Sequence, residues 1–372
     1  MSDKVNVGFI IEQALGHITH GKNLQTNVSD DLEINAFWGF PKQPHSGLMA
    51  LPGIRNWTLQ AGLQAGQEIK GMHKNGRVIH SLFFHTQVTA ILSGRWMKKI
   101  PSIVSLDATP LQYDSLGEFY EHSGGPSWLE NYKFKLNQAC YERASHLVTW
   151  SQWAKDSLVK DYGVADEKIT VIPPGVNLDE WQLDDLDAKR INQNRPVNLL
   201  FVGGALKRKG GYDLIEAFSA AQEELPKDSV ALHLVTKENL QKNIPRITVY
   251  NDMRPNSPEL KDLYRKADIF CLPTYGDCLP MVLSEAAATA LPVISTNVAA
   301  IPEIVQSEKS GLLIKPGDVQ ALKEAIVALV KKPNLRLEMG NHALGQTKNQ
   351  YDAKANAKQL FNLLKRIAKK SP

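Results

Sequence analysis

Short apolar runs alternate with longer amphipathic stretches along the whole chain, and this pattern predicts parallel β-strands separated by helices. In the N-terminal half, helices are predicted at residues 61–72, 126–144 and 151–162. The apolar runs of this half predict strands at 5–11, 32–38, 78–84, 103–107, 145–150 and 169–172.

The same alternation starts afresh near residue 197. Residues 197–202 are apolar except for Asn198, as in a strand that is buried on both faces of a sheet. Helices are predicted at 211–225, 257–266 and 319–330, and a last helix at 352–368. Further strands are predicted at 230–235, 247–250, 267–272, 293–295 and 311–314.

The length of 372 residues predicts two domains, because a single core rarely grows to that size. A polar run of mixed charge at 182–195 is the expected linker. We therefore predict an α/β protein with Rossmann-like domains at 1–181 and 196–351. Two such domains would face each other across a cleft, and clefts between domains are favoured ligand sites.

Composition narrows the choice of function. Hydrophobic residues make up 43% of the chain and the formal charge is +4, which suits an anionic substrate but is weak for a nucleic-acid-binding protein. The three cysteines, of which Cys271 is expected to pack in a strand, show neither metal-site nor disulfide-framework spacing. The N-terminus is predicted to be a strand rather than a signal peptide, and no apolar run is long enough to span a bilayer. The expected location is the cytoplasm.

Two carboxylates stand out in the second half, Asp277 in a loop after a predicted strand and Glu285 on a helix that opens near Met281. A helix N-terminus offers unpaired amides and a partial positive charge, so it attracts phosphate. Pro280 suits the first helical turn, which leaves the amides of Met281 and Val282 for a ligand. We expect the two acids to hold hydroxyls of a ligand that also carries phosphate, such as a sugar nucleotide. The alternative is that Glu285 is bonded to a neighbouring loop.

A glycine-rich basic loop follows the strand at 197–202. Gly203 and Gly204 permit a tight turn and close approach of a ligand, and three consecutive cations follow them. Lys209 is placed to neutralise a leaving diphosphate, with Arg208 and Lys207 beside it. The alternative is a solvated basic turn. The Walker A pattern is absent.

Polar residues also follow strands in the first half, where they are candidates for a site. Gly16 and His17 come after the first strand, and His85 comes after the third. His17 and His85 are candidates for contact with an acceptor, whereas His20 is expected at the surface. Asp107 follows the fourth strand. It orients an acceptor hydroxyl or acts as a base, or else it caps the turn before Thr109.

Two stretches, 92–99 and 363–370, mix apolar and basic residues. Either can contact an anionic membrane surface. The alternative is that both are ordinary helix ends, where cations interact favourably with the helix dipole.

These motifs together resemble the retaining GT-B glycosyltransferases of the family 4 type, the glycosyl transferases group 1 superfamily. The resemblance implies two Rossmann-like domains, a C-terminal helix at 352–368 that packs back onto the first, and retention of anomeric configuration without a required metal. The segments that carry it are TWSQWA at 149–154, VIPPGVN at 171–177, FVGGALKRKG at 201–210, and ADIFCLPT at 267–274 with Asp277, Glu285, LPVI at 291–294 and IPE at 301–303.

The resemblance also implies roles for individual residues. Lys209, with Arg208, would stabilise the departing diphosphate, while Asp277 would contact the donor sugar and Glu285 the ribose. The other donor-binding candidates it implies are Gly16, Gly204, Leu279, Met281 and Val282. The sequence departs from the family pattern at four positions: Asp277 replaces a glutamate, Gly204 an arginine, Asp107 a histidine and Ala290 a glycine.

The resulting hypothesis is a retaining glycosyltransferase that uses a nucleoside-diphosphate sugar and an acceptor hydroxyl of a glycan, lipid or small molecule. The alternative is a catalytically impaired sugar-nucleotide-binding protein with a regulatory or scaffold role, which the altered acid and the missing arginine permit. A nicotinamide dehydrogenase is disfavoured because GxGxxG is missing. No nucleic-acid partner, metal or other cofactor is expected, and the acceptor and oligomeric state are left open.

Overall fold

The computed structural model describes residues 4–13, 16–42, 57–117, 125–181, 195–240 and 244–369. The chain divides into two compact units. The first contains residues up to Gly117, the segment that ends at Pro174, and the C-terminal residues from Ala353; the second extends from Gly175 to Asp352. Apart from Arg195, the predicted linker 182–195 lies outside the described residues.

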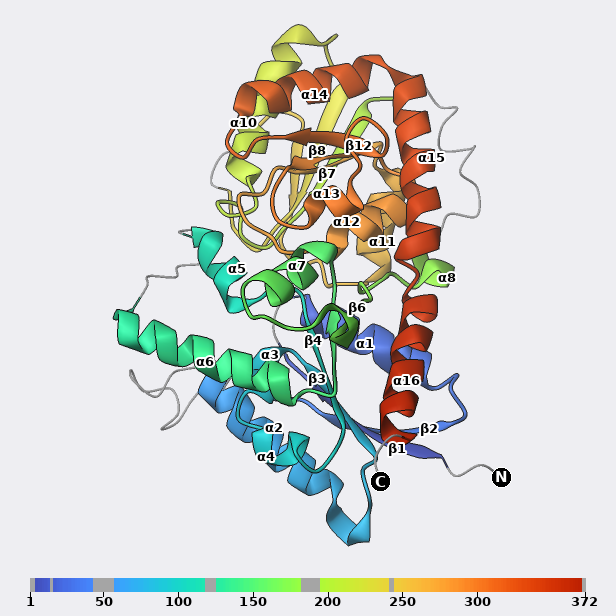
Figure 1. Ribbon diagram of the computed structural model, residues 1–372. Helices are drawn as coiled ribbons and strands as arrows, with labels where there is room; N and C mark the ends of the chain where they lie inside the picture. The colour runs from blue at the N-terminus through green and yellow to red at the C-terminus, as the bar shows by residue number, and fades with distance from the viewer. Residues whose placement is uncertain are drawn as a thin grey trace. The chain divides into compact units, whose positions relative to one another are not determined.

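The first unit is built on a parallel sheet with the strand order β2-β1-β3-β4-β5-β6 (Figure 1). In this order the chain reverses direction across the sheet between β1 and β3, which is the switch point where ligands bind in open α/β sheets. The strands are β1 (Val5–Ile11), β2 (Ile34–Gly39), β3 (Ser81–His85), β4 (Ser102–Leu106), β5 (His146–Thr149) and β6 (Ile169–Val171).

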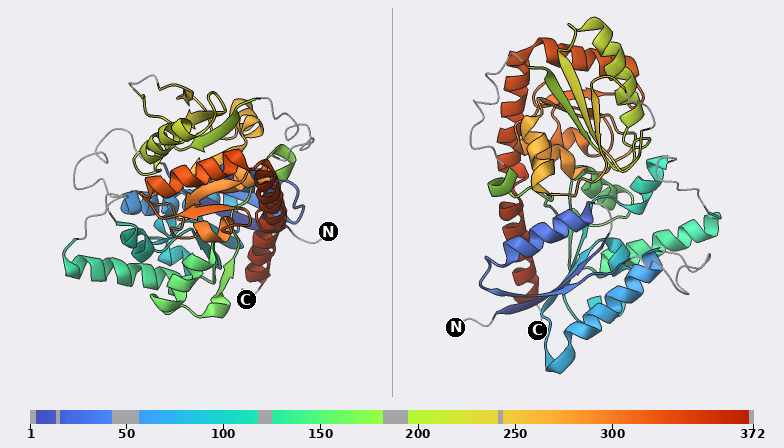
Figure 2. Two further views of the ribbon diagram at one scale, coloured as in Figure 1. Left: turned by 90° about the horizontal axis from the view of Figure 1, so that it is seen from above. Right: turned by 180° about the vertical axis from the view of Figure 1, so that it is seen from behind.

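Helices cover this sheet on both faces (Figure 2). One core contains Phe84 and Tyr141, and the other contains Phe9, Phe83 and Phe361. Phe361 of the last helix meets the ring of Phe9 edge-on, with the ring centroids 6.2 Å apart. The helices are α1 (His17–Val28), α2 (Trp57–Met72), α3 (Gln87–Ala90), α4 (Gly94–Met97), α5 (Pro110–Ser115), α6 (Ser127–Arg143), α7 (Gln152–Lys160) and α16 (Ala353–Lys369), with 3-10 turns at Lys74–Gly76 and Asp166–Lys168.

The second unit has a parallel sheet with the order β12-β11-β10-β7-β8-β9, so its switch point lies between β7 and β10. Its strands are β7 (Val197–Val202), β8 (Val230–Val235), β9 (Ile247–Tyr250), β10 (Ile269–Leu272), β11 (Val293–Thr296) and β12 (Gly311–Ile314). Its helices are α8 (Leu178–Trp181), α10 (Gly211–Glu224), α11 (Pro258–Lys266), α12 (Met281–Ala288), α13 (Ile301–Ile304), α14 (Val319–Lys331) and α15 (Pro333–Gln350).

Helix α8 belongs to the second unit, although the sequence predicts a first domain that runs to residue 181. The reason is a set of side-chain contacts. Trp181 meets Tyr264 of α11 edge-on at 5.1 Å between ring centroids, and Lys261 of the same helix forms a salt bridge with Glu180.

The predicted fold class is confirmed, since the twelve predicted strands form two doubly wound sheets. The boundaries differ most at β2 and β3, which begin after Leu32 and Val78. Both side chains are apolar but exposed, at 79% and 61%. An exposed apolar residue next to a strand makes the predicted strand longer than the strand that forms.

Candidate functional site

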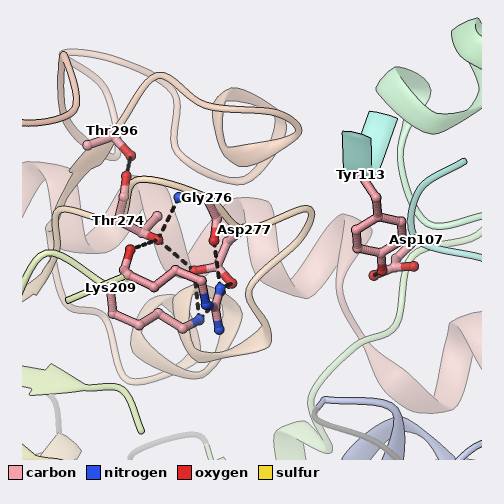
Figure 3. A network of polar contacts seen from close by, with 8 residues as sticks. Asp107, Tyr113, Lys209, Thr274, Gly276, Asp277 and Thr296 are labelled. Atoms are coloured by element: carbon pink, nitrogen blue, oxygen red, sulfur yellow. Dashed lines mark hydrogen bonds and ion pairs between the residues drawn. The ribbon is translucent and has the colours of Figure 1, made fainter. Parts of the chain in front are cut away.

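A lysine and an aspartate meet at the switch point of the second unit. The loop after β7 carries Lys209 and the loop after β10 carries Asp277, and the strand order makes these loops neighbours. Lys209 Nζ lies 2.7 Å and 2.6 Å from the two carboxylate oxygens of Asp277 (Figure 3). Asp277 is 7% exposed, so the ion pair forms at a largely buried carboxylate.

Two further residues donate to the same carboxylate. Arg208 Nη1 lies 3.1 Å from Oδ1 of Asp277 and 2.6 Å from the carbonyl oxygen of Gly276. Thr274 Oγ1 donates to Oδ2 at 2.9 Å. Hydrogen bonds to an ionised group are about twice as strong as neutral ones, so this arrangement fixes the Asp277 side chain. The sequence reading assigned Thr274 no role, and its only signal was a hydroxyl directly after the apolar strand.

Gly210 allows the loop after β7 to lie against the end of β10. Its φ is +70°, and an added Cβ would lie 1.9 Å from the carbonyl oxygen of Pro273. Only glycine satisfies both requirements. Because Gly210 follows Lys209 directly, this contact places the lysine beside Asp277.

The glycine-rich basic loop also contains Gly204 and Lys207, and neither reaches Asp277. Gly204 is exposed, and its nearest side-chain neighbour is Lys237. Lys207 is exposed and forms no salt bridge with any residue that the structure describes. Of the two cations that precede Lys209 in the sequence, Arg208 is therefore the one whose side chain reaches Asp277.

Glu285 lies in the second turn of α12, which begins at Met281 and has Pro280 as its N-cap residue. The carboxylate is 7% exposed, and its Oε2 accepts a hydrogen bond from the Tyr264 hydroxyl at 3.0 Å. Burial raises the pKa of Glu285 to about 7, against the lowering effects of the Tyr264 hydrogen bond and the Lys261 charge. Leu279 is buried in the preceding loop, and Met281 and Val282 supply the first two amides of the helix.

Tyr264 is a site residue that the sequence did not indicate. It lies on α11, is fully buried, and stacks on Phe270 with 5.5 Å between ring centroids. From the sequence it would be assigned to the core, and its ring does pack there. Its hydroxyl is the feature that could have identified it, because a buried tyrosine hydroxyl needs a hydrogen-bond partner.

We expect the substitution Tyr264→Phe to raise the pKa of Glu285 further, because the carboxylate loses its donor. A carboxylic acid whose native pKa exceeds its unfolded value holds a proton that the unfolded chain releases, so stability falls as pH rises between the two values. In the variant this fall should continue to higher pH than in the wild type. Urea unfolding between about pH 5 and pH 9 measures it, and parallel curves for the two proteins would contradict the prediction.

In the first unit, His17 and His85 lie together at the carboxyl edge of the sheet. Their rings are 4.9 Å apart, and both pack against Trp150. The Nδ1 atoms of His17 and His85 are buried and have no hydrogen-bond partner among the described residues. Gly16 is exposed and precedes His17 as the N-cap of α1.

His20 was expected at the surface, and this prediction is wrong. It is buried, and its Nδ1 lies 2.9 Å from Nε2 of His85. The reason is helical periodicity: residues three apart share a face of α1, so His20 follows His17 onto the same surface. Burial lowers the pKa of His20 to about 3 and that of His85 well below its ordinary value, with the charge of His17 as a second cause.

Asp107 follows β4 and is 8% exposed. Its Oδ2 accepts a hydrogen bond from the Tyr113 hydroxyl at 2.7 Å (Figure 3), and its Oδ1 is buried without a partner among the described residues. The cap of α5 is Thr109, whose side chain accepts from the Gln112 amide. Thr109 rather than Asp107 is therefore the side-chain cap of α5, and Asp107 is bonded to Tyr113 instead.

Two features are absent from the described residues. No group of three histidine, cysteine, aspartate or glutamate side chains in this part of the chain is arranged to hold a metal ion. Nor does any described helix combine the length and apolar character needed to cross a membrane.

Comparison with known families matches both halves of the chain. Residues 34–180 match the model of "Glycosyltransferase Family 4", and residues 196–332 match that of "Glycosyl transferases group 1".

Among curated proteins, a D-inositol 3-phosphate glycosyltransferase of Corynebacterium jeikeium is 26% identical over 249 residues, which is 62% of this chain and 59% of that protein. The capsular polysaccharide biosynthesis glycosyltransferase CapM of Staphylococcus aureus is 23% identical over 244 residues, 61% of this chain and 63% of that protein. The chain thus spans somewhat more than half the length of these relatives.

Solved structures share the fold over nearly the whole chain. Sucrose-phosphate synthase from Thermosynechococcus elongatus superposes with a TM-score of 0.77 at 17% identity and covers 99% of this chain and 100% of its own. Anabaena Alr3699/HepE in complex with UDP-glucose gives a TM-score of 0.70 at 15% identity, with 97% and 99% covered.

Proposed function

The chain belongs to the glycosyl transferases group 1 family, and we propose that it transfers a sugar from a nucleoside-diphosphate sugar to an acceptor hydroxyl of a glycan, lipid or small molecule. The observation that carries this proposal is the arrangement at the β7–β10 switch point. Two cations and an aspartate cluster there, and a helix N-terminus with a buried glutamate follows in the next segment. A solved structure of the same fold contains UDP-glucose, which agrees with a nucleotide-sugar donor.

The ribose of the donor is proposed to bind Glu285. Tyr264 occupies Oε2, and no described residue donates to Oε1, so one carboxylate oxygen is available for ribose hydroxyls. The amides of Met281 and Val282 are proposed to hold a phosphate at the start of α12. Leu279 and Gly204 would line the same donor site.

The diphosphate is proposed to bind Lys209, supported by Arg208. Both cations now contact Asp277, so a bound diphosphate would share them with this carboxylate. Their positive charge would take the role that a metal ion has in other sugar-nucleotide enzymes, and no metal is proposed. Asp277 would contact the donor sugar, and its shorter side chain would alter the fit of that sugar relative to a glutamate.

The proposed reaction retains the anomeric configuration. The bond between the anomeric carbon and the diphosphate breaks, and its electron pair stays on the phosphate oxygen. The acceptor oxygen bonds to the same face of the sugar while its proton passes to that phosphate oxygen. The contacts of Asp277 support this route over a covalent intermediate, because both its oxygens accept from Lys209 and are poor nucleophiles in that state.

On the acceptor side we propose Asp107, His17 and His85, with Gly16 near the donor phosphates. The buried oxygen and ring nitrogens without partners among the described residues support this assignment, because a bound hydroxyl would satisfy them. The cytoplasm, where sugar nucleotides are available, is the proposed location.

A thermal-shift screen of nucleoside diphosphates and their sugars tests the proposed function. A ligand at 100 times its Kd should stabilise the protein by about 2.7 kcal/mol. The donor selected in this way should release its nucleoside diphosphate when acceptors are added. No stabilisation by any member of the panel would contradict the proposal. Stabilisation without turnover on a broad acceptor panel would favour a binding protein with a regulatory or scaffold role.

A further inference from the structure

The first unit has a basic hollow of about 460 Å³ that none of the candidate site residues lines. It is formed by the end of α3, by α4 and by the last residue of α6, and no acidic residue lines it. Its lining residues are Ile91, Leu92, Gly94, Arg95, Lys98, Lys99 and Arg143.

The four cations of the basic hollow are exposed. Arg95, Lys98 and Lys99 come from one short stretch with helical spacing, and Arg143 lies over Gly94. None of the four forms a salt bridge with a residue that the structure describes. Four like charges around one hollow repel each other, and an anion at this place would relieve that repulsion.

Exposed leucines adjoin the basic hollow. Leu92 is 41% exposed, and it lies against Gly62 of α2, where an added Cβ would be 2.8 Å from its Cγ. Leu59 and Leu63 are four residues apart on α2 and flank Gly62 in the sequence. They are 48% and 54% exposed. Apolar side chains beside cations give this surface the character of segments that lie on membranes.

The sequence has a second stretch of apolar and basic residues at 363–370, and it differs from 92–99 because several of its side chains have partners within the fold. Leu364 and Ile367 of α16 are buried in the core of the first unit. Lys365 lies 3.0 Å from Asp31 and 2.7 Å from Glu33. The fold therefore accounts for the composition of α16, whereas it leaves the cations of the basic hollow and the three leucines exposed.

We propose that the surface formed by the basic hollow and the leucines Leu59, Leu63 and Leu92 binds the head groups of an anionic phospholipid bilayer. The phosphates would pair with the cations, and the leucines would enter the boundary with the acyl chains. The leucines favour a bilayer over a soluble phosphate compound, which has nothing for them to contact. This binding goes beyond the proposed transfer and does not depend on the donor site.

Sedimentation of the full chain with lipid vesicles tests the proposal. We expect binding to phosphatidylcholine vesicles that contain phosphatidylglycerol, weaker binding at high salt, and little binding to phosphatidylcholine alone. The triple variant R95Q/K98Q/K99Q should bind the anionic vesicles about a hundredfold more weakly, at about fivefold per cation. The variant L59S/L63S should also bind more weakly, and its loss should persist at high salt.

The matched control is K22Q/K160Q/K354Q, which removes the same charge from exposed lysines elsewhere on the first unit. It should bind the vesicles nearly as well as the wild type. Equal losses in the two triple variants, or equal binding to neutral and anionic vesicles, would overturn the proposal. Stabilisation by inorganic phosphate without vesicle binding would overturn it too, in favour of a soluble anion. The nucleotide thermal shift should be unchanged in both triple variants, which separates this test from that of the donor site.

Discussion

Replacing Lys209 with methionine should lower kcat for sugar transfer about a hundred- to a thousandfold, the usual effect of removing one group that stabilises developing charge. The leaving diphosphate gains negative charge as its bond to the sugar breaks. Lys209 Nζ is the cation held at the switch point by two contacts below 3 Å to Asp277. Methionine preserves the length and apolar part of the side chain and removes only the charge.

Lys207→Met is the matched control, because Lys207 is two residues away, exposed, and outside the Asp277 cluster. This substitution should leave kcat within about twofold of the wild type, because it removes an exposed charge outside the proposed site. Steady-state kinetics with the donor from the screen, at a temperature where both variants are folded, measures the effect. Equal losses in the two variants would show that only the general positive potential of the loop matters.

Glu285→Gln has the second large expected effect, and it acts on binding and stability in opposite directions. At about pH 8 the substitution should weaken nucleoside-diphosphate binding ten- to a hundredfold, because hydrogen bonds to a charged group contribute about 1.5–3 kcal/mol. Stability should rise at the same pH. The native pKa of about 7 exceeds the ordinary 4.5, so ionising Glu285 costs the folded protein stability as pH rises through that interval.

Glutamine is neutral at every pH, so the stability gain of this variant should be largest above pH 7 and vanish near the ordinary glutamate pKa of 4.5. Urea unfolding as a function of pH measures the gain, and isothermal titration calorimetry measures the binding. A variant that loses both stability and binding at about pH 8 would contradict the assignment, because it would make Glu285 a structural residue.

The sequence predicted the fold well because both sheets are parallel and their central strands are largely buried. Strands such as Val197–Val202 are buried on both faces and read as continuous apolar runs, so their number and order along the chain are plain. The sequence predicted the ends less well. Val78 is apolar and exposed, so its hydrophobicity predicted a strand that begins at residue 78. The strand in the sheet begins at Ser81.

The central pair of the site was also within reach of sequence reasoning. Loops that follow adjacent parallel strands meet at one edge of the sheet, and Lys209 and Asp277 lie in two such loops. Tyr264 could not be found in this way, because its ring belongs to the core and only its hydroxyl reaches Glu285. His20 was misplaced because no helix was predicted where α1 forms, so the face that His20 shares with His17 was not apparent from the sequence.

The most direct test of the central claim is whether the Glu285 carboxylate holds the ribose of the donor. Calorimetry at about pH 8 would compare the nucleoside diphosphate from the screen with its 2′,3′-dideoxy analogue, on the wild type and on Glu285→Gln. The account predicts that loss of the hydroxyls weakens binding to the wild type at least tenfold and has little further effect on the variant, a coupling that marks a direct contact. Equal losses in the two proteins would contradict it.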